Sequence, residues 1–259
     1  MKQQSSMGMN RTGVQMSPMD TSDMQNTPQS MTPSTQGDAA MLAEARRRYI
    51  EEADQVGSIP VPGTVKGALT TGAAMLTGDQ PQLLIDKLGE RLAFERTGTR
   101  LYDALITKFE ATQDNTTSMT LADLQKIRQD ELRHFSIINE AIQSIGGDPT
   151  AQTPCADITG VASMGIMQVL TDPRTTMAQS LQAILMAEMT DNAGWEMLIA
   201  LAEEQGQDAL VPDFSAALDE ERVHLQQVRN WLEEATLGKV VSAGAIVDDM
   251  SDQRPSPLH

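Results

Sequence analysis

The stretch DEERVHLQQV, residues 219–228, places His224 three positions after Glu221 in a segment with the composition of a helix. A second Glu-x-x-His sequence holds Glu131 and His134 at the same interval. Side chains three positions apart on a helix lie on one face, so each pair can offer a carboxylate and an imidazole to a single point. The two copies therefore predict a helical fold with a polar centre.

The composition favours an all-α protein and is compatible with divalent cations as partners. Of the 259 residues, 40% are hydrophobic, enough for one main domain, and only 3% are aromatic, which favours helices over sheets. The chain has 36 acidic and 19 basic residues, a net charge of -17, and no Lys/Arg run that could follow a phosphate backbone. We therefore expect no nucleic-acid or membrane partner, whereas divalent cations fit the charge.

The cysteine content and the N-terminal sequence indicate a cytoplasmic, soluble protein. Cys155 is the one cysteine, which excludes an intrachain disulfide and a Cys-x-x-Cys site built from this chain. The N-terminus lacks the apolar core of a signal peptide, and no apolar run approaches the ~18 residues that span a bilayer. The third histidine, His259, ends the sequence and is expected to be inert.

The chain divides into four regions. Residues 1–38 are rich in Ser, Thr, Gln, Pro and Met without helical or strand periodicity, which predicts a disordered tail. Residues 39–82 read as a short helix followed by a Pro/Gly-punctuated connector. Residues 83–236 form the helical domain, and the polar residues 237–259 form a C-terminal tail.

Four helices account for the pattern after residue 83, where apolar residues recur at alternating intervals of three and four. The second helix begins with a capping-box sequence, Thr120 and Asp123, and ends at Gly146-Gly147. Residues 148–175 then form a connection long enough to cross a whole bundle. The expected architecture is a four-helix bundle with a long central crossover, of the up-down-down-up kind.

Each of the four apolar stripes is interrupted near its middle by residues of types that commonly bind metals. These residues are Glu95 in the first helix, Glu131 and His134 in the second, Glu188 in the third, and Glu221 and His224 in the fourth. Four carboxylates that converge in a core without counter-charge would be strongly destabilising, so a cation is expected among them. This set suits iron or manganese, with zinc as a further option, and two bridged divalent ions would balance the four carboxylates.

The two halves of the helical domain match each other. Tyr102 follows Glu95 by seven positions, and Trp195 follows Glu188 by seven. In each half the first glutamate is followed, after a similar interval, by a Glu-x-x-His sequence. This spacing indicates an internal two-fold repeat of helix pairs.

Three further glutamates, Glu90, Glu196 and Glu220, fall outside the apolar stripes. Glutamates at such positions are usually solvated, and no role at the polar centre is assigned to them.

The order Glu, Glu-x-x-His, Glu, Glu-x-x-His resembles the ferritin-like superfamily of carboxylate-bridged di-metal four-helix bundles, and in particular its rubrerythrin-like members. The motifs that carry the resemblance are ERTGTRLY (95–102), ELRH (131–134), EMTDNAGW (188–195) and ERVH (221–224). The resemblance covers residues 83–236. It implies that Glu95 and Glu188 are terminal or bridging ligands, that Glu131 and Glu221 bridge, and that His134 and His224 bind one metal ion each.

Two more residues receive roles from this resemblance. Asp191, one turn after Glu188, falls where some rubrerythrin-like proteins have an additional carboxylate ligand. Its shorter side chain, and Gly98 at the symmetric position, favour an outer or ion-entry role. Tyr102 lies where such proteins often hold a ligand carboxylate through the phenol, with an ordinary core aromatic as the alternative.

The resemblance implies a ferroxidase- or peroxidase-type oxidoreductase that reacts with O2 or H2O2 at a di-iron or iron/manganese centre. Its role would be iron oxidation and handling or peroxide defence, and the protein is expected to form a homo-oligomer, most simply a dimer. A rubredoxin module needs four cysteines, so the electron donor is unknown. The alternatives are a dimanganese catalase and a non-catalytic metal-binding or assembly protein that uses the bundle as a scaffold.

Overall fold

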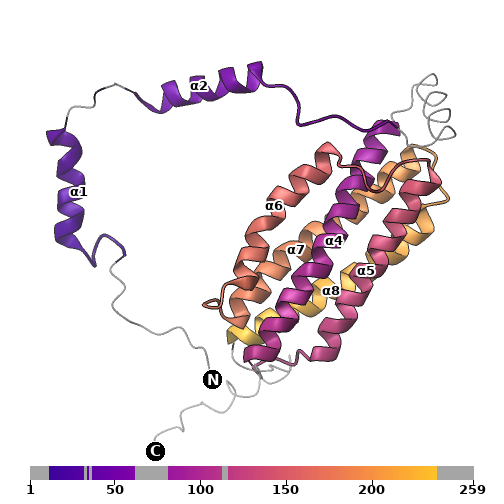
Figure 1. Ribbon diagram of the computed structural model, residues 1–259. Helices are drawn as coiled ribbons and strands as arrows, with labels where there is room; N and C mark the ends of the chain where they lie inside the picture. Colours follow the sequence, from indigo (N-terminus) through magenta and orange to yellow (C-terminus); the bar gives the residue numbers. More distant parts are fainter. Residues whose placement is uncertain (1–11, 32–33, 35–36, 62–80, 113–115, 238–259) are drawn as a thin grey trace, which may run out of the picture. The chain divides into compact units, whose positions relative to one another are not determined.

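The computed structural model describes residues 12–31, 34, 37–61, 81–112 and 116–237, and the chain forms two compact units, Lys2–Val56 and Gly57–His259 (Figure 1). Every regular element within the described ranges is a helix, which confirms the all-α prediction for this part of the chain. None of these described helices combines the length and the apolar character needed to cross a membrane.

In the described part of the N-terminal unit there are two helices, α1 (Pro18–Ser30) and α2 (Ala39–Glu52), and neither has a buried residue. Helix α1 differs from the expectation of a tail without regular structure. Pro18 at its first position and Asp20 in its first turn favour a helix start, but a helix with no buried face has no apolar period to detect. The connector expected up to residue 82 lies mostly outside the described residues.

Among its described residues, the second unit contains five helices, which lie side by side (Figure 1). They are α4 (Pro81–Thr112), α5 (Leu121–Ser144), α6 (Pro154–Thr171), α7 (Met177–Glu204) and α8 (Val211–Leu237). Helix α4 packs against α5, α6 and α7, and α7 also packs against α6 and α8. The predicted helix signals at Thr120 and Gly146 are confirmed: Thr120 and Asp123 form a capping box, and Gly146 follows α5 with a φ of 87°.

Two apolar clusters fix the direction of the helices. The Leu105 cluster joins the second half of α4 and of α8 to the first half of α5 and of α7, and the Leu88 cluster joins the opposite halves. Helices α4 and α5 are therefore antiparallel, as are α7 and α8. The midpoints of all four helices lie between the two clusters.

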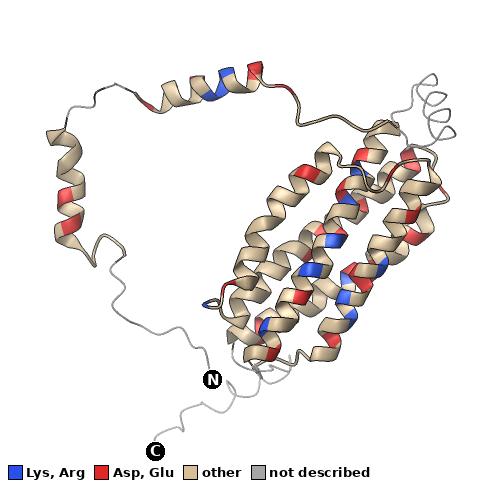
Figure 2. Ribbon diagram, in the orientation of Figure 1, with Lys and Arg blue, Asp and Glu red and all other residues tan. Residues whose placement is uncertain are grey.

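Helix α6 lies within the connection 148–175, to which no helix was assigned from the sequence. Thr153 caps it by accepting a hydrogen bond from the backbone amide of Ala156 at 3.3 Å, and Pro154 occupies its first position. Only three of its 18 residues are buried, and Asp157 is its one charged residue (Figure 2). The helix therefore shows no amphipathic stripe in the sequence.

Both ends of α6 are attached to α4. At the N-terminal end, the backbone amide of Cys155 donates a hydrogen bond to Asp86 Oδ1 at 2.8 Å. At the other end, Lys108 Nζ donates to the carbonyl oxygens of Val169 and Asp172 at 3.3 and 3.0 Å. Since carbonyl groups at a helix C-terminus lack partners within the helix, Lys108 stabilises that end. The connection thus runs along α4 and brings α7 back to the far end of α4.

Candidate metal centre

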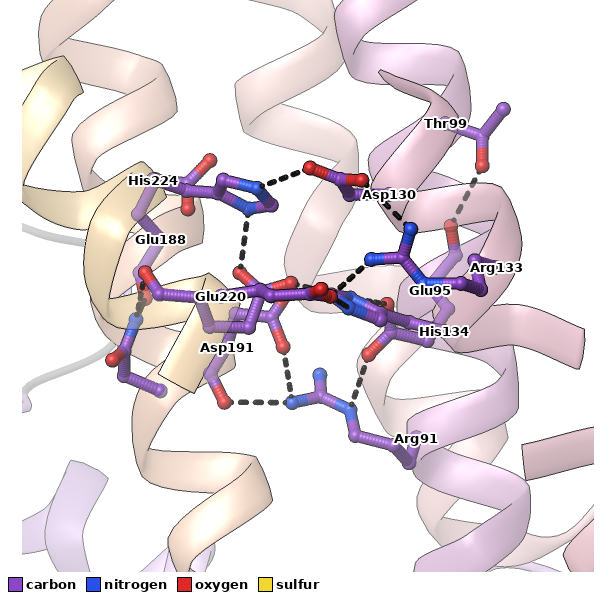
Figure 3. Close-up of polar contacts among 12 residues, drawn as sticks. Arg91, Glu95, Thr99, Asp130, Arg133, His134, Glu188, Asp191, Glu220 and His224 are labelled. Atoms are coloured by element: carbon purple, nitrogen blue, oxygen red, sulfur yellow. Dashed lines mark hydrogen bonds and ion pairs between the residues drawn. The ribbon is translucent and has the colours of Figure 1, made fainter. Parts of the chain in front are cut away.

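The structure places the seven predicted metal-binding residues in one layer between the Leu105 and Leu88 clusters. Glu95, His134, Glu188, Asp191 and His224 are labelled in Figure 3. Each side chain comes from the middle of its helix, and each residue is at most 2% exposed. They are Glu95 on α4, Glu131 and His134 on α5, Glu188 and Asp191 on α7, and Glu221 and His224 on α8. A layer this acidic inside a core is a candidate ion site.

Six of the seven residues form groups of three whose ligand atoms all lie within 4.8 Å of one another. The groups are Glu95, His134 and Glu221; Glu131, Glu221 and His224; and Glu95, Glu131 and Asp191. These buried groups can hold a metal ion. Glu221 belongs to both groups that contain a histidine, as a bridging carboxylate would.

Glu221 lies between the two imidazoles. His134 Nδ1 is 2.6 Å from Glu221 Oε1, and His224 Nδ1 is 3.3 Å from Glu221 Oε2. The sequence pairs His134 with Glu131, but its nearest carboxylate in the layer comes from α8. The expectation that each Glu-x-x-His pair points to one position therefore fits the α8 pair, whereas the α5 pair divides between neighbouring groups.

Three carboxylate oxygens in the layer are buried and have neither a hydrogen-bond partner nor a close ionic partner. They are Oε2 of Glu95, Oε2 of Glu131 and Oε2 of Glu188. Glu95 Oε1 and Glu221 Oε1 are also buried, but Arg91 Nε lies 3.2 Å from the first and His134 Nδ1 lies 2.6 Å from the second. A buried acceptor without a partner loses its solvation without compensation, which is destabilising. A cation would satisfy several of these oxygens at once, so the residues present fit a metal site.

The electrostatics of the layer are consistent with this fit. Burial, together with the neighbouring acidic side chains, raises the pKa of Glu95, Glu131 and Glu188 well above the ordinary glutamate value. Burial likewise raises the pKa of Asp191 to about 7, although the charge of Arg91 opposes the shift. A cation in the layer would favour the ionised form of all four.

Glu221 behaves differently. Burial tends to raise its pKa, but the adjacent His134 and His224 outweigh burial and lower the pKa to about 2. Glu221 is thus ionised at neutral pH.

The Nε2 atom of each histidine contacts a carboxylate to which no role was assigned from the sequence. His224 Nε2 lies 3.1 Å from Asp130 Oδ2, and His134 Nε2 lies 2.8 Å from Glu220 Oε2. Each acid directly precedes the glutamate of the opposite Glu-x-x-His motif, so the support is reciprocal between α5 and α8. Such hydrogen bonds fix the tautomer and orientation of the ring and leave Nδ1 facing the layer.

The expectation that Glu220 is only a solvated charge is therefore wrong. Its side chain is 41% exposed, yet it reaches the buried imidazole of His134 and also pairs with Arg133. The signal was present in the sequence: an acidic residue stands immediately before both motifs, as DELRH and as EERVH. Glutamate is long enough to reach inward from a position off the apolar stripe.

Tyr102 lies where the resemblance implies. Its hydroxyl donates a hydrogen bond to Glu188 Oε1, and the residue is 2% exposed. Asn192 adds to this side of the layer, because its Nδ2 donates to the carbonyl oxygens of Glu188 at 2.9 Å and Glu221 at 3.0 Å. Tyr102 thus joins α4 to α7, and Asn192 joins α7 to α8.

Arg91 was missed by the sequence analysis. It is 4% exposed, its Nε lies 3.2 Å from Glu95 Oε1, and its Nη1 lies 2.7 Å from Asp191 Oδ1. Gly194 leaves room for the guanidinium, since a Cβ there would lie 2.3 Å from Nη1. Arg91 stands four positions before Glu95, on the same face of α4, and that spacing was its one sequence signal.

In comparisons with protein-family models, curated proteins and solved structures, no match to the chain was found. The conclusions about function rest on the residues of the layer.

Proposed function

We propose that the second unit is a ferritin-like four-helix bundle, formed by α4, α5, α7 and α8, whose crossover carries α6. We further propose that its centre binds two metal ions, iron or manganese. The buried carboxylates of Glu95, Glu131, Glu188 and Glu221 carry this proposal, because they converge from four helices onto one layer and three of their oxygens have no partner. The antiparallel pairs and the connection along α4 agree with the architecture.

The two groups that contain a histidine are the proposed ligand sets. Glu95 and His134 would hold one ion, Glu131 and His224 the other, and Glu221 would contact both. A mixed carboxylate and imidazole set suits iron and manganese better than soft ions that prefer thiolates. Two predicted metal-binding residues lie outside these two groups, Glu188 and Asp191, and Tyr102 orients Glu188 by a hydrogen bond.

We propose that the protein is an oxidoreductase that consumes O2 or H2O2, in iron oxidation or peroxide defence. Bound as a pair, iron or manganese ions supply the two electrons that such a substrate takes up. The chain supplies the surroundings: Asp130 and Glu220 orient the imidazoles, and the apolar clusters on both sides exclude water. Carboxylates that carry protons before a cation binds, as the raised pKa of Glu95 indicates, release them on binding.

The test is metal content per chain combined with consumption of O2 or H2O2 after addition of Fe(II) or Mn(II). Wild type is compared with Glu131→Ala/Glu221→Ala and with Glu196→Gln, an exposed glutamate on α7 that serves as the control. We expect about two ions and oxidant consumption in wild type and in the control, and neither in the double variant. Wild type without bound metal would overturn the proposed site, and metal binding without oxidant consumption would favour a non-catalytic protein.

Oligomeric state stays a prediction from the sequence. Light scattering of the metal-loaded protein distinguishes the expected dimer from a closed shell of many subunits.

A further inference from the structure

The three groups in the layer are not equivalent. Two contain a histidine, but the third consists of carboxylates alone: Glu95, Glu131 and Asp191. An all-oxygen group of this kind attracts hard divalent cations such as Mn2+, Mg2+ or Ca2+. If all three groups were open to ions, the centre would hold more than a pair.

The third group already has a cation, the guanidinium of Arg91. Arg91 contacts two of its three carboxylates, through Nε to Glu95 and through Nη1 to Asp191 (Figure 3). Nη1 also donates to the backbone carbonyl of Asp191 at 2.9 Å, so Asp191 is held at two points. The contact with Asp191 is a charge-assisted hydrogen bond, which is stronger than a neutral one, whereas Glu95 lies within ion-pair distance only.

The surroundings of the guanidinium are shaped to keep it in place. Its carbon lies 4.4 Å from the centre of the Phe94 ring and 5.9 Å from that of Trp195. Gly194 provides the space that a larger residue would fill. The guanidinium of Arg91 is therefore buried and contacts two carboxylates, a carbonyl group and two aromatic rings. Arg91 is part of the centre.

The charge balance agrees with this assignment. The layer contains five carboxylates, those of Glu95, Glu131, Glu188, Asp191 and Glu221, and Arg91 offsets one of them. The four that remain match two divalent ions when both histidines are neutral. Arg91 therefore balances the charge of Asp191, and the remaining carboxylates match two metal ions.

We propose that Arg91 is the resident cation of the third group: it withdraws Asp191 from metal binding and limits the centre to two ions. This inference rests on the proposed metal site. Arg91 acts through Asp191 and Glu95 and is a positioning residue that sets capacity and selectivity.

The first test is Asp191→Asn, with metal ions per chain and Mn2+ affinity as readouts. The asparagine keeps the shape of the side chain and an oxygen for Arg91, so the variant should fold. We expect two ions per chain, as in wild type, and an affinity lower by no more than about tenfold, the smaller effect typical of a residue that supports a ligand. Loss of one ion would show that Asp191 is a ligand and would overturn the inference alone, since wild type would still hold two.

The second test is Arg91→Met, which removes the guanidinium but fills most of its volume. We expect a third Mn2+ per chain at saturation, and a melting temperature that rises with added Mg2+ or Ca2+ far more than that of wild type. Arg91→Lys, which keeps a cation, and Arg91→Met/Asp191→Asn, which removes the third group, should both return to two ions. Two ions in Arg91→Met, with no change of melting temperature in Mg2+ or Ca2+, would contradict the inference. If Arg91→Met does not fold, the result for Asp191→Asn decides whether the inference holds.

Discussion

The α4–α5 half of the centre and the α7–α8 half carry the same ligand types at equivalent positions but differ in what surrounds them. Glu95 and Glu188 correspond, and seven positions later Tyr102 corresponds to Trp195. Four positions before the glutamate, however, one half has Arg91 and the other has Ile184, which is fully buried in the Leu105 cluster.

The residues one turn after the glutamates differ as well: Gly98 in the first half and Asp191 in the second. Arg91 and Asp191 pair across the layer, while the equivalent positions, Ile184 and Gly98, have no ionic group. At Gly98 an added Cβ would lie 1.9 Å from Glu131 Oε2, so the missing side chain makes room for a proposed ligand. The comparison teaches that the proposed ligands follow the repeat predicted from the sequence, whereas their neighbours Arg91, Asp191 and Gly98 do not.

The largest effect is expected from Gly98→Ala, which adds a Cβ beside Glu131 in the α4–α5 half. The new Cβ would displace the Glu131 carboxylate, so metal affinity should fall by more than the roughly 10- to 100-fold typical of mutating a residue that supports a ligand. Isothermal titration with Mn2+ measures it. Gly165→Ala on α6, where no atom lies within 4 Å of the new Cβ, is the matched control and should bind as wild type does. Equal affinities in the two variants would contradict the role of Gly98.

Metal removal should lower thermal stability, because a cation compensates the buried carboxylates. At a free-metal concentration of 100 times Kd, binding stabilises the folded state by about 2.7 kcal/mol. Melting with and without a chelator checks this, and adding metal back should restore the transition. Glu131→Gln should show no such difference, and its melting temperature in chelator should exceed that of wild type, because an amide removes one buried acid from the layer. A chelator-sensitive melting temperature in Glu131→Gln would argue against Glu131 as a ligand.

The two supporting carboxylates offer a second comparison between the halves. Asp130→Asn and Glu220→Gln should each weaken metal binding, by about 10- to 100-fold for a residue that orients a ligand histidine. The loss should be larger for Asp130, which is 3% exposed, than for Glu220, whose side chain is 41% exposed and competes with water for His134. Metal titrations of both variants in parallel provide the ranking. The reverse order would mean that exposure does not govern this support.

The smallest effect is expected from Tyr102→Phe, which removes the hydroxyl that donates to Glu188. Losing this hydrogen bond should lower the free energy of unfolding by about 1 kcal/mol in the presence of a chelator. Urea unfolding measures the change. Tyr49→Phe, at a residue that is 72% exposed on α2, should leave stability unaltered. If both substitutions are neutral, Tyr102 is a packing residue only.

Much of the helical unit could be predicted from the sequence, because the residues that build it repeat at helical spacing. The Thr120 capping box and the glycines after α5 and α7 mark helix ends through local chemistry. Helix α6 could not be found in this way, since it buries three of 18 residues and is apolar on its outer side as well. Its start was nonetheless encoded by Thr153 and Pro154.

In the candidate site, too, some residues could be predicted from the sequence and others could not. Glutamates and histidines that interrupt an apolar stripe are visible to periodicity, and the structure brings these residues together in one layer. Arg91 and Glu220 were missed because their reach depends on side-chain length and on which helix lies opposite. Asp130, which directly precedes Glu131, was missed for the same reason. Sequence spacing identifies residues on one helix face, but partners across the layer come from three-dimensional packing.

The most direct test of the central claim is a crystal structure of the protein loaded with iron or manganese, with anomalous diffraction recorded at the edge of that metal. We predict two anomalous peaks, one beside Glu95 and His134 and the other beside Glu131 and His224, with Glu221 in contact with both and Arg91 still paired with Asp191. A layer without a peak, or a peak bound by Asp191 in place of Arg91, would contradict the account.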